Sequence, residues 1–306
     1  MIKTRHAFVL GLVLTLLWPD VASGNIRILA SVFPLREFAS AVVGERGGAA
    51  QLLPPGAGVH NWQPKPGDIM RLGSADLLIA VGSGLEPWLS GVVGAVPARK
   101  LRVLEVSRGL TLLAAKDEEG EEAPEVHEHG PVDPHIWLDF GLDEVITDRI
   151  AAVLSEIDPS GAGYFRQNAA SLKDRLRRLD VRFSEALKNC AGKKIVIAGH
   201  AAFGYLAHRY GLVQTALYGL SPDAEPRPQQ MMRVIEFCRR ENIRTIFFEN
   251  SVPPRLARTL AAEIGGRIAV LNEGHNLTRD QMLKGVGFFD MMEENLMALR
   301  EGLGCR

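Results

Sequence analysis

The sequence predicts an α/β protein of two (βα) lobes, each with a parallel-type sheet, joined by a long rigid backbone helix. Three observations predict this fold class. The chain has 306 residues, more than the roughly 250–300 at which a single hydrophobic core stops growing. Short apolar runs alternate with amphipathic segments in both halves, which is the pattern of βα units. A long segment with one apolar stripe separates the halves and is typical of an extended helix.

Residues 1–24 have the composition of an export signal. Lys3 and Arg5 precede a largely apolar run over residues 7–18, and small residues follow at 21–24. A membrane anchor is the alternative, but a bilayer span needs about 20 apolar residues. No cysteine near the expected cleavage point, close to residue 24, could carry a lipid. We therefore expect a periplasmic protein that is not lipid-anchored.

Two sets of strand-like runs follow, one in the N-terminal lobe (25–158) and one in the C-terminal lobe (191–306). Helical patterns lie between several of these runs, so we expect one parallel sheet in each lobe. The runs are 26–30, 51–53, 76–81 and 101–106 in the first lobe, and 194–198, 213–217, 245–249 and 267–271 in the second.

The segment 159–190 is expected to link the lobes as a helix. A helical pattern over 143–156 is broken by Pro and Gly at 158–163 and resumes from Tyr164 to Lys188. A helix of about 25 residues would be about 37 Å long, enough to run along both lobes. We therefore expect this helix to be a rigid connection between the lobes, called the spine below, and not a flexible tether.

One segment, 116–130, lacks any apolar periodicity. It contains seven acidic residues together with His127 and His129. Such a composition is typical of a mobile surface loop. The two histidines could collect metal loosely, as in a passive metal store or an adhesin, or the loop could simply be solvated.

The overall composition excludes several classes of protein. With 46% hydrophobic and 23% charged residues, the chain is an ordinary globular protein and not a disordered or fibrous one. It has 35 basic and 36 acidic residues and a net charge of −1. No basic excess exists to neutralise a phosphate backbone, so nucleic acid is not expected as a partner.

The chain has three cysteines, Cys190, Cys238 and Cys305, and none lies in a CxxC pair. This excludes thiolate zinc ribbons and dithiol redox sites. In an oxidising compartment at most one internal bridge can form. Cys305, at the chain end, would pair with Cys190 or Cys238. We favour Cys190, because Cys238 lies in an apolar helical pattern and reads as a buried core thiol.

Three of the eight histidines, His60, His135 and His200, lie just after a strand-like run or at the start of a helix. Ligands of open α/β sheets bind beyond the carboxyl ends of the strands. Three imidazoles in such loops could therefore converge in one cleft. Histidine-rich ligand sets suit Zn²⁺, whereas Mn²⁺ prefers more oxygen, so zinc is the expected ion and Mn²⁺ the less favoured one.

A three-histidine zinc hydrolase is the main rival from another class of protein, because catalytic zinc also takes three protein ligands and one open position. The sequence has no HExxH motif and no obvious general base next to a ligand. We therefore expect that the protein is not an enzyme.

Short segments around these histidines and elsewhere carry a family resemblance. They are GVHNWQPKPGD (58–68), DPHIWLD (133–139), GHAAFGY (199–205), YGL (210–212), SPDAEP (221–226), IFFE (246–249) and MMEENL (291–296). Together they resemble the zinc- and manganese-type solute-binding proteins of ABC importers, in order and over essentially the whole mature chain. Zinc-type, ZnuA-like members carry His at the third metal position, where manganese-type members tend to have Glu, so His200 favours zinc.

The resemblance implies two lobes on a rigid helix, with the ion held between them by His60, His135 and His200. The family usually supplies a fourth ligand, an Asp, at the end of a late strand. Here the matching stretch is VLNEGHN (270–276), with Asn272 in the expected place. Glu273 or His275 could take over as the fourth ligand, or water could complete the shell.

The function that follows from this resemblance is high-affinity zinc capture in the periplasm. The expected partner is the membrane permease of an ABC importer, and a metallochaperone could also load the site. We expect a monomer. Neutral imidazole ligands need a hydrogen-bond acceptor on their other ring nitrogen, and Asp133 and Glu249 are the candidates.

Overall fold

The computed structural model describes residues 25–95, 101–115, 132–220, 227–249 and 253–306. The expected export signal (1–24) and the acidic segment with His127 and His129 (116–130) lie outside the described residues. Within the described residues, no helix combines the length and the apolar character that a bilayer span requires.

The N-terminal lobe contains a four-stranded parallel sheet of order β2-β1-β3-β4. Three of its strands lie where the sequence predicts them. The predicted strand at 51–53 is displaced, because the edge strand β2 ends at Gln51. Position 47, at the start of β2, requires glycine, because a Cβ there would collide with the backbone of β1. The strands are β1 (Ile26–Ala30), β2 (Gly47–Gln51), β3 (Leu77–Ala80) and β4 (Arg102–Glu105).

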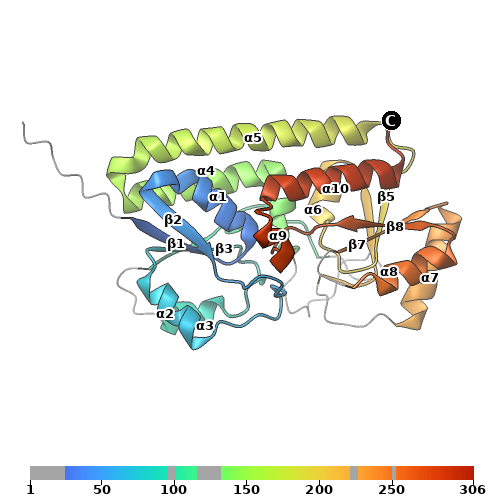
Figure 1. Cartoon of the computed structure of the whole chain (residues 1–306), viewed down its shortest axis with the longest axis horizontal. Coiled ribbons are helices and arrows are strands. Elements are labelled where there is room, and N and C mark those ends of the chain that lie inside the picture. The colour runs from blue at the N-terminus through green and yellow to red at the C-terminus, as the bar shows by residue number, and fades with distance from the viewer. Residues whose placement is uncertain (1–24, 96–100, 116–131, 221–226, 250–252) are drawn as a thin grey trace, which may run out of the picture.

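Helices cover both sides of this sheet. In Figure 1, α1 and α4 lie between the sheet and the long helix α5, and α2 and α3 lie on the opposite side. The helices of this lobe are α1 (Phe33–Val43), α2 (Pro66–Ser74), α3 (Leu89–Ala95) and α4 (Phe140–Ile157), with short 3-10 turns at Gly44–Arg46, Ile136–Leu138 and Pro159–Gly161.

The C-terminal lobe repeats the arrangement with a parallel sheet of order β6-β5-β7-β8, so β8 lies at one edge. All four strands were predicted from the sequence. They are β5 (Lys194–Ile197), β6 (Val213–Ala216), β7 (Thr245–Glu249) and β8 (Arg267–Leu271). The helices are α6 (Gly204–Arg209), α7 (Pro228–Arg240), α8 (Arg255–Glu263), α9 (Arg279–Leu283) and α10 (Phe288–Leu303).

The long helix α5 (Ala162–Lys188) runs along both lobes (Figure 1). Its apolar stripe, including Leu172, Leu179 and Phe183, is buried as the periodicity predicts. One continuous hydrophobic cluster takes in this stripe, the faces of α1, α4 and α10, and β strands of both sheets. The two lobes therefore share a core along the spine.

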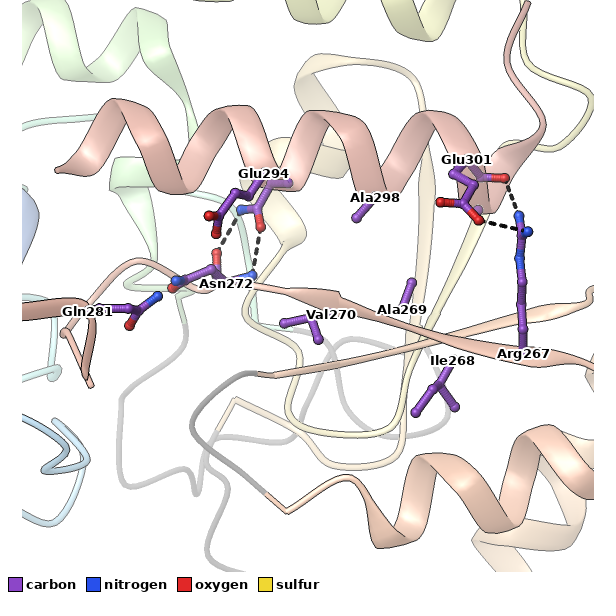
Figure 2. A pocket seen from close by; sticks show the side chains of 11 residues that line it. Arg267, Ile268, Ala269, Val270, Asn272, Gln281, Glu294, Ala298 and Glu301 are labelled. Atoms are coloured by element: carbon purple, nitrogen blue, oxygen red, sulfur yellow. Dashed lines mark hydrogen bonds and ion pairs between the residues drawn. The ribbon is translucent and has the colours of Figure 1, made fainter. Parts of the chain in front are cut away.

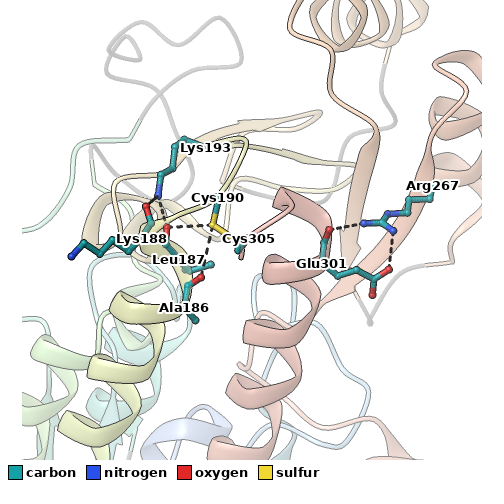
Figure 3. Close-up of a disulfide and its surroundings, with 8 residues drawn as sticks. All are labelled: Ala186, Leu187, Lys188, Cys190, Lys193, Arg267, Glu301 and Cys305. Carbon is teal, nitrogen blue, oxygen red and sulfur yellow. Dashed lines mark hydrogen bonds and ion pairs between the residues drawn. A yellow bond between two sulfur atoms is a disulfide. The ribbon is translucent and has the colours of Figure 1, made fainter.

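A disulfide joins the ends of two helices. Cys190, just after α5, is bonded to Cys305, just after α10 (Figure 3). The pairing favoured from the sequence is confirmed, and Cys238 is a free thiol that is fully buried in the C-terminal lobe. The bridge fixes the last helix to the spine.

Candidate metal centre

Two of the three predicted histidines, His60 and His200, lie in loops that leave the carboxyl ends of strands. His60 lies in the loop between β2 and α2, His135 comes just before the 3-10 turn Ile136–Leu138, and His200 follows β5. The sharp exit from β5 requires Gly199, because a Cβ at that position would collide with the Glu249 carboxylate. Both lobes thus contribute to one site, at the strand ends where α/β proteins bind ligands.

The structure brings these three side chains together. Each offers one ligand atom, and these atoms lie within 4.8 Å of one another. The ring centroids are 5.1 to 5.5 Å apart, and the Nε2 atoms of His135 and His200 are 3.3 Å apart. Tetrahedral zinc with bonds of about 2.0–2.1 Å places its ligand nitrogens about 3.3 Å apart. The spacing therefore fits a single ion of that size.

The site is buried, with His135 and His200 each 1% exposed and His60 6% exposed. Burial removes competing water, but it also disfavours any charge that is not compensated. Two buried carboxylates, those of Asp133 and Glu249, lie directly behind the rings and can compensate a positive charge at the site.

Asp133 orients His135. Its Oδ1 accepts the backbone N–H of His135 at 2.9 Å and lies 2.8 Å from the ring Nδ1. A ring that donates from Nδ1 keeps Nε2 unprotonated and available as a ligand. The contact between Asp133 and the His135 ring that the sequence led us to expect is therefore present.

Glu249, the last residue of β7, plays a related part beside His200. Its Oε1 accepts the His200 backbone N–H at 2.6 Å and lies 2.8 Å from Nδ1. The negative charge of Glu249 acts on the ring more strongly than a hydrogen bond to it does, so this contact is mainly electrostatic. It nevertheless directs Nε2 of His200 towards His135.

These surroundings shift the pKa values of His135 and His200 in opposite directions. Burial lowers the pKa of His135, and the hydrogen bond and charge of Asp133 offset only part of that effect. Burial also acts to lower the pKa of His200, but the charge and close contact of Glu249, with smaller effects from Glu273 and Asp133, raise it overall. The cluster thus combines imidazole nitrogens with nearby negative charge, which suits a divalent cation.

The two candidates for a fourth ligand follow β8. Glu273 and His275 are 2% and 6% exposed, and His275 Nδ1 lies 3.2 Å from Glu273 Oε1. Burial, with repulsion from His200 and His135, lowers the pKa of His275 to about 3. In the described residues, however, neither joins the three histidines in the group whose ligand atoms lie within 4.8 Å.

Asn272, which stands where the family usually has an aspartate, has a different use here. Its Oδ1 accepts the backbone N–H of Gly274 at 2.9 Å, and Gly274 has a positive φ of 78° that favours glycine. The amide therefore shapes a turn that presents the next side chains to the cleft.

Sequence reasoning missed two residues that hold this turn. Trp137 donates its indole N–H to the carbonyl of Glu273 at 2.7 Å. Asn295, on α10, exchanges two hydrogen bonds with the backbone of Asn272. Both lie inside segments that carry the family resemblance, which was the only signal available, since neither residue type by itself indicates a metal site.

Comparisons with known proteins find zinc-binding relatives. A high-affinity zinc uptake system protein of Bacillus subtilis, ZnuA, is 32% identical over 286 residues, covering 93% of this chain and 89% of that protein. A zinc-binding protein AdcA of Streptococcus pyogenes is 31% identical over 291 residues and covers 92% of this chain. The chain spans little more than half of that protein, 56% of its length.

Solved structures share the fold. The Zn(II)-bound ZnuA-like domain of Streptococcus pneumoniae AdcA has a TM-score of 0.78 and 29% sequence identity. The match covers 92% of this chain and 99% of that domain. The family model for ZnuA, described as zinc-uptake complex component A, periplasmic, matches residues 28–302. The chain therefore belongs to the ZnuA family of metal-binding solute-binding proteins, which serve in metal uptake and are not enzymes.

Proposed function

We propose that this protein captures Zn²⁺ between its two lobes and delivers it to the membrane permease of an ABC importer. The observation that carries the proposal is the buried three-imidazole cluster, with two Nε2 atoms at the separation expected around one zinc ion. Zinc is the cargo, and His60, His135 and His200 are its proposed ligands. The buried carboxylates of Asp133 and Glu249 offset the charge of the ion.

The same proposal divides the chain into functional parts. Residues 1–24 are an export signal that places the protein in the periplasm, 25–158 and 191–306 are the two lobes that contribute ligands, and 159–190 is the link between them. The protein acts as a monomer that meets the permease, and a metallochaperone could load it.

A fourth ligand comes from the turn after β8. Glu273 is the stronger candidate, because its charge already acts on His200 and a carboxylate would balance the ion. His275, 3.2 Å from Glu273, would then orient that carboxylate. The roles could be reversed, so Glu273→Gln and His275→Gln should be compared. The variant that loses more zinc affinity identifies the ligand.

Zinc titration of the purified protein tests the main proposal. Wild type should bind one tight equivalent, and His60→Ala should weaken binding by at least about 100-fold, since it removes a direct ligand. His208→Ala is the matched control, because His208 is an exposed histidine on α6 outside the cluster. Equal affinity in wild type and His60→Ala would reject the site.

Manganese competition tests the choice of ion. A nitrogen-rich site should retain zinc when Mn²⁺ is in large excess. Displacement of zinc by equimolar Mn²⁺ would instead favour the manganese-type alternative of the same family.

A further inference from the structure

The turn that follows β8 and carries Glu273 and His275 is held from behind by α10. We propose that Asn295, on α10, is a positioning residue for zinc binding, which acts only through the backbone of this turn. The inference rests on the proposed function, because it assumes that the turn supplies the fourth zinc ligand. It assigns to a buried side chain on the last helix a part in how tightly the ion is held.

The contact between Asn295 and Asn272 is reciprocal. The backbone N–H of Asn272 donates to Asn295 Oδ1 at 2.7 Å, and Asn295 Nδ2 donates to the Asn272 carbonyl, also at 2.7 Å. Figure 2 shows Asn272 at the end of β8, joined to α10 by two dashed hydrogen bonds, and both Asn272 and Asn295 line a pocket of about 350 Å³ between β8 and α10. A primary amide can satisfy both backbone groups at once because it has a donor and an acceptor on one rigid plane.

The position of this contact explains why a side chain is needed. β8 is an edge strand, and Asn272 is the first residue after it. In the sheet as the structure describes it, no strand lies beside β8 on the α10 side to form hydrogen bonds with the backbone of Asn272. Because buried backbone groups need partners, Asn295 takes the place of that strand and fixes where the turn begins.

From this fixed start, further bonds set the course of the turn. Asn272 Oδ1 holds the N–H of Gly274, and Trp137 holds the carbonyl of Glu273. The carbonyl of His275 accepts the N–H of Phe33, the first residue of α1, at 2.9 Å. The turn is therefore tied to α10 at one end and to the N-terminal lobe at the other, with Glu273 between the two anchors.

Asn295 is itself well fixed. It is 1% exposed, and α10 is held to the spine by the disulfide at its carboxyl end. Close to Asn295, Met292 and Leu296 pack into the shared core. A rigid residue that touches the backbone of a ligand-bearing turn can limit the movement of that turn, which is what a positioning residue does.

Two substitutions separate this role from general packing. Asn295→Ala removes both hydrogen bonds, whereas Asn295→Asp keeps the size and one acceptor but places a carboxylate oxygen against the Asn272 carbonyl. We expect both to weaken zinc binding by about 10–100-fold, in the range found for residues that support metal ligands. The dissociation rate, measured by chelator competition, should rise by a similar factor.

Leu299→Ala is the matched control. Leu299 is fully buried on the same helix and belongs to the same apolar cluster, but it makes no polar contact with the turn in the described structure. This variant should lower the melting temperature at least as much as Asn295→Ala while leaving zinc affinity within about threefold of wild type. If Leu299→Ala weakens zinc binding as much as Asn295→Ala does, Asn295 has only a structural role and the proposal is wrong.

A double-mutant cycle tests whether Asn295 acts through the turn. In a background with both Glu273→Gln and His275→Gln, zinc would be held by the three histidines, and Asn295→Ala should then change affinity by less than about twofold. An undiminished effect in that background would overturn the inference. If Asn295→Ala does not fold, the cycle is completed with Asn295→Asp, which has the same expected outcome.

The failure of this inference can be told apart from the failure of the proposed function. If His60→Ala binds zinc as tightly as wild type, the metal centre itself is misplaced. If His60→Ala loses zinc but both Asn295 variants bind like wild type, only the role of Asn295 is refuted. Faster hydrogen exchange of the Gly274 amide in the metal-free Asn295 variants gives a readout that does not depend on zinc.

Discussion

Asp143 is a carboxylic acid that is completely buried in the first turn of α4. In the described part of the chain, neither of its side-chain oxygens has a hydrogen-bond partner. Burial raises the pKa of Asp143 well above its ordinary value, repulsion from Asp139 adds to this effect, and Arg209 offsets part of it. The folded protein therefore binds a proton at Asp143 more tightly than the unfolded chain does.

This raised pKa predicts the sign of a pH effect. As the pH rises above the ordinary value of about 3.9, the unfolded chain loses this proton first. The free energy of unfolding therefore falls as the pH rises towards the folded pKa of Asp143, and it stays at the lower value above that pKa. An amide at this position cannot ionise, so Asp143→Asn should be more stable than wild type at about pH 8, by ~1–3 kcal/mol, and similar near pH 4. Urea unfolding at the two pH values measures this difference. A variant less stable at both values would show that the carboxylate is favourable where it lies.

The proposed histidine ligands predict a second pH effect, on the affinity for zinc. A protonated imidazole cannot bind zinc, so affinity should fall by more than about 100-fold between about pH 7.5 and pH 5, since the ordinary histidine pKa is about 6.5. Because the pKa of His200 is raised and that of His135 is lowered, the His200 ring should be protonated before the His135 ring as the pH falls. Zinc titrations at the two pH values, with His208→Ala as the control, test this. Equal affinities would contradict a three-histidine shell.

Among the elements, α10 contacts α1 of the N-terminal lobe at its start and the end of α5 at its carboxyl end. Phe288, at its start, packs edge-on against Phe38 of α1 with ring centroids 5.1 Å apart, and Cys305 bonds to the end of α5. Beside the bridge, Lys193 donates to the carbonyl of Leu187 and closes the turn after the spine (Figure 3). The helix is therefore secured at both ends, which gives Asn295 a fixed base.

The disulfide should contribute stability by restricting the unfolded chain. It closes a loop of 115 residues, and removal of such a bridge typically costs about 2–5 kcal/mol. Cys305→Ser should lower the free energy of unfolding by that amount, measured by urea denaturation. A reducing agent should do the same to wild type and should leave Cys305→Ser unchanged. An unaltered unfolding midpoint in Cys305→Ser would show that the bridge adds nothing to stability.

At the scale of the whole molecule, the two lobes are braced by the spine. Arg209, at the end of α6, pairs with Asp180 of α5 at 2.6 and 2.7 Å, and with Asp139, the N-cap of α4, at 2.7 Å. Tyr210 also donates to Asp180 at 2.7 Å. These contacts link the segment after His200 to the segment after His135. Together with the shared apolar core, they oppose independent movement of the lobes.

This bracing predicts only a local response to zinc. A shared core repacks with difficulty, so zinc binding should change the radius of gyration by less than about 0.5 Å. Small-angle X-ray scattering with and without zinc tests this, with His60→Ala as the control for non-specific effects of the metal. A clear contraction in wild type alone would reveal hinge closure and would contradict a rigid spine.

The sequence by itself determined the architecture and which three histidines come together. Apolar runs alternate with helical stripes strongly enough to predict seven of the eight strands and the spine, because burial of these residues drives the local structure. The meeting of His60, His135 and His200 could be predicted from their places after strand-like runs or before a helix, where α/β proteins bind ligands, together with the family resemblance. The start of β2 was missed because its residues, GGAAQ, carry no apolar alternation.

Only the tertiary structure decided how the turn after β8 is built. Asn272 shapes a turn, Asn295 holds that turn from α10, and Asp143 is buried without a partner in the described structure. None of these roles leaves a periodic or spacing signal, because each depends on contacts between elements far apart in the chain or on the depth at which a side chain is packed. Local sequence fixes which loops leave a sheet edge, and packing fixes which atoms then face one another.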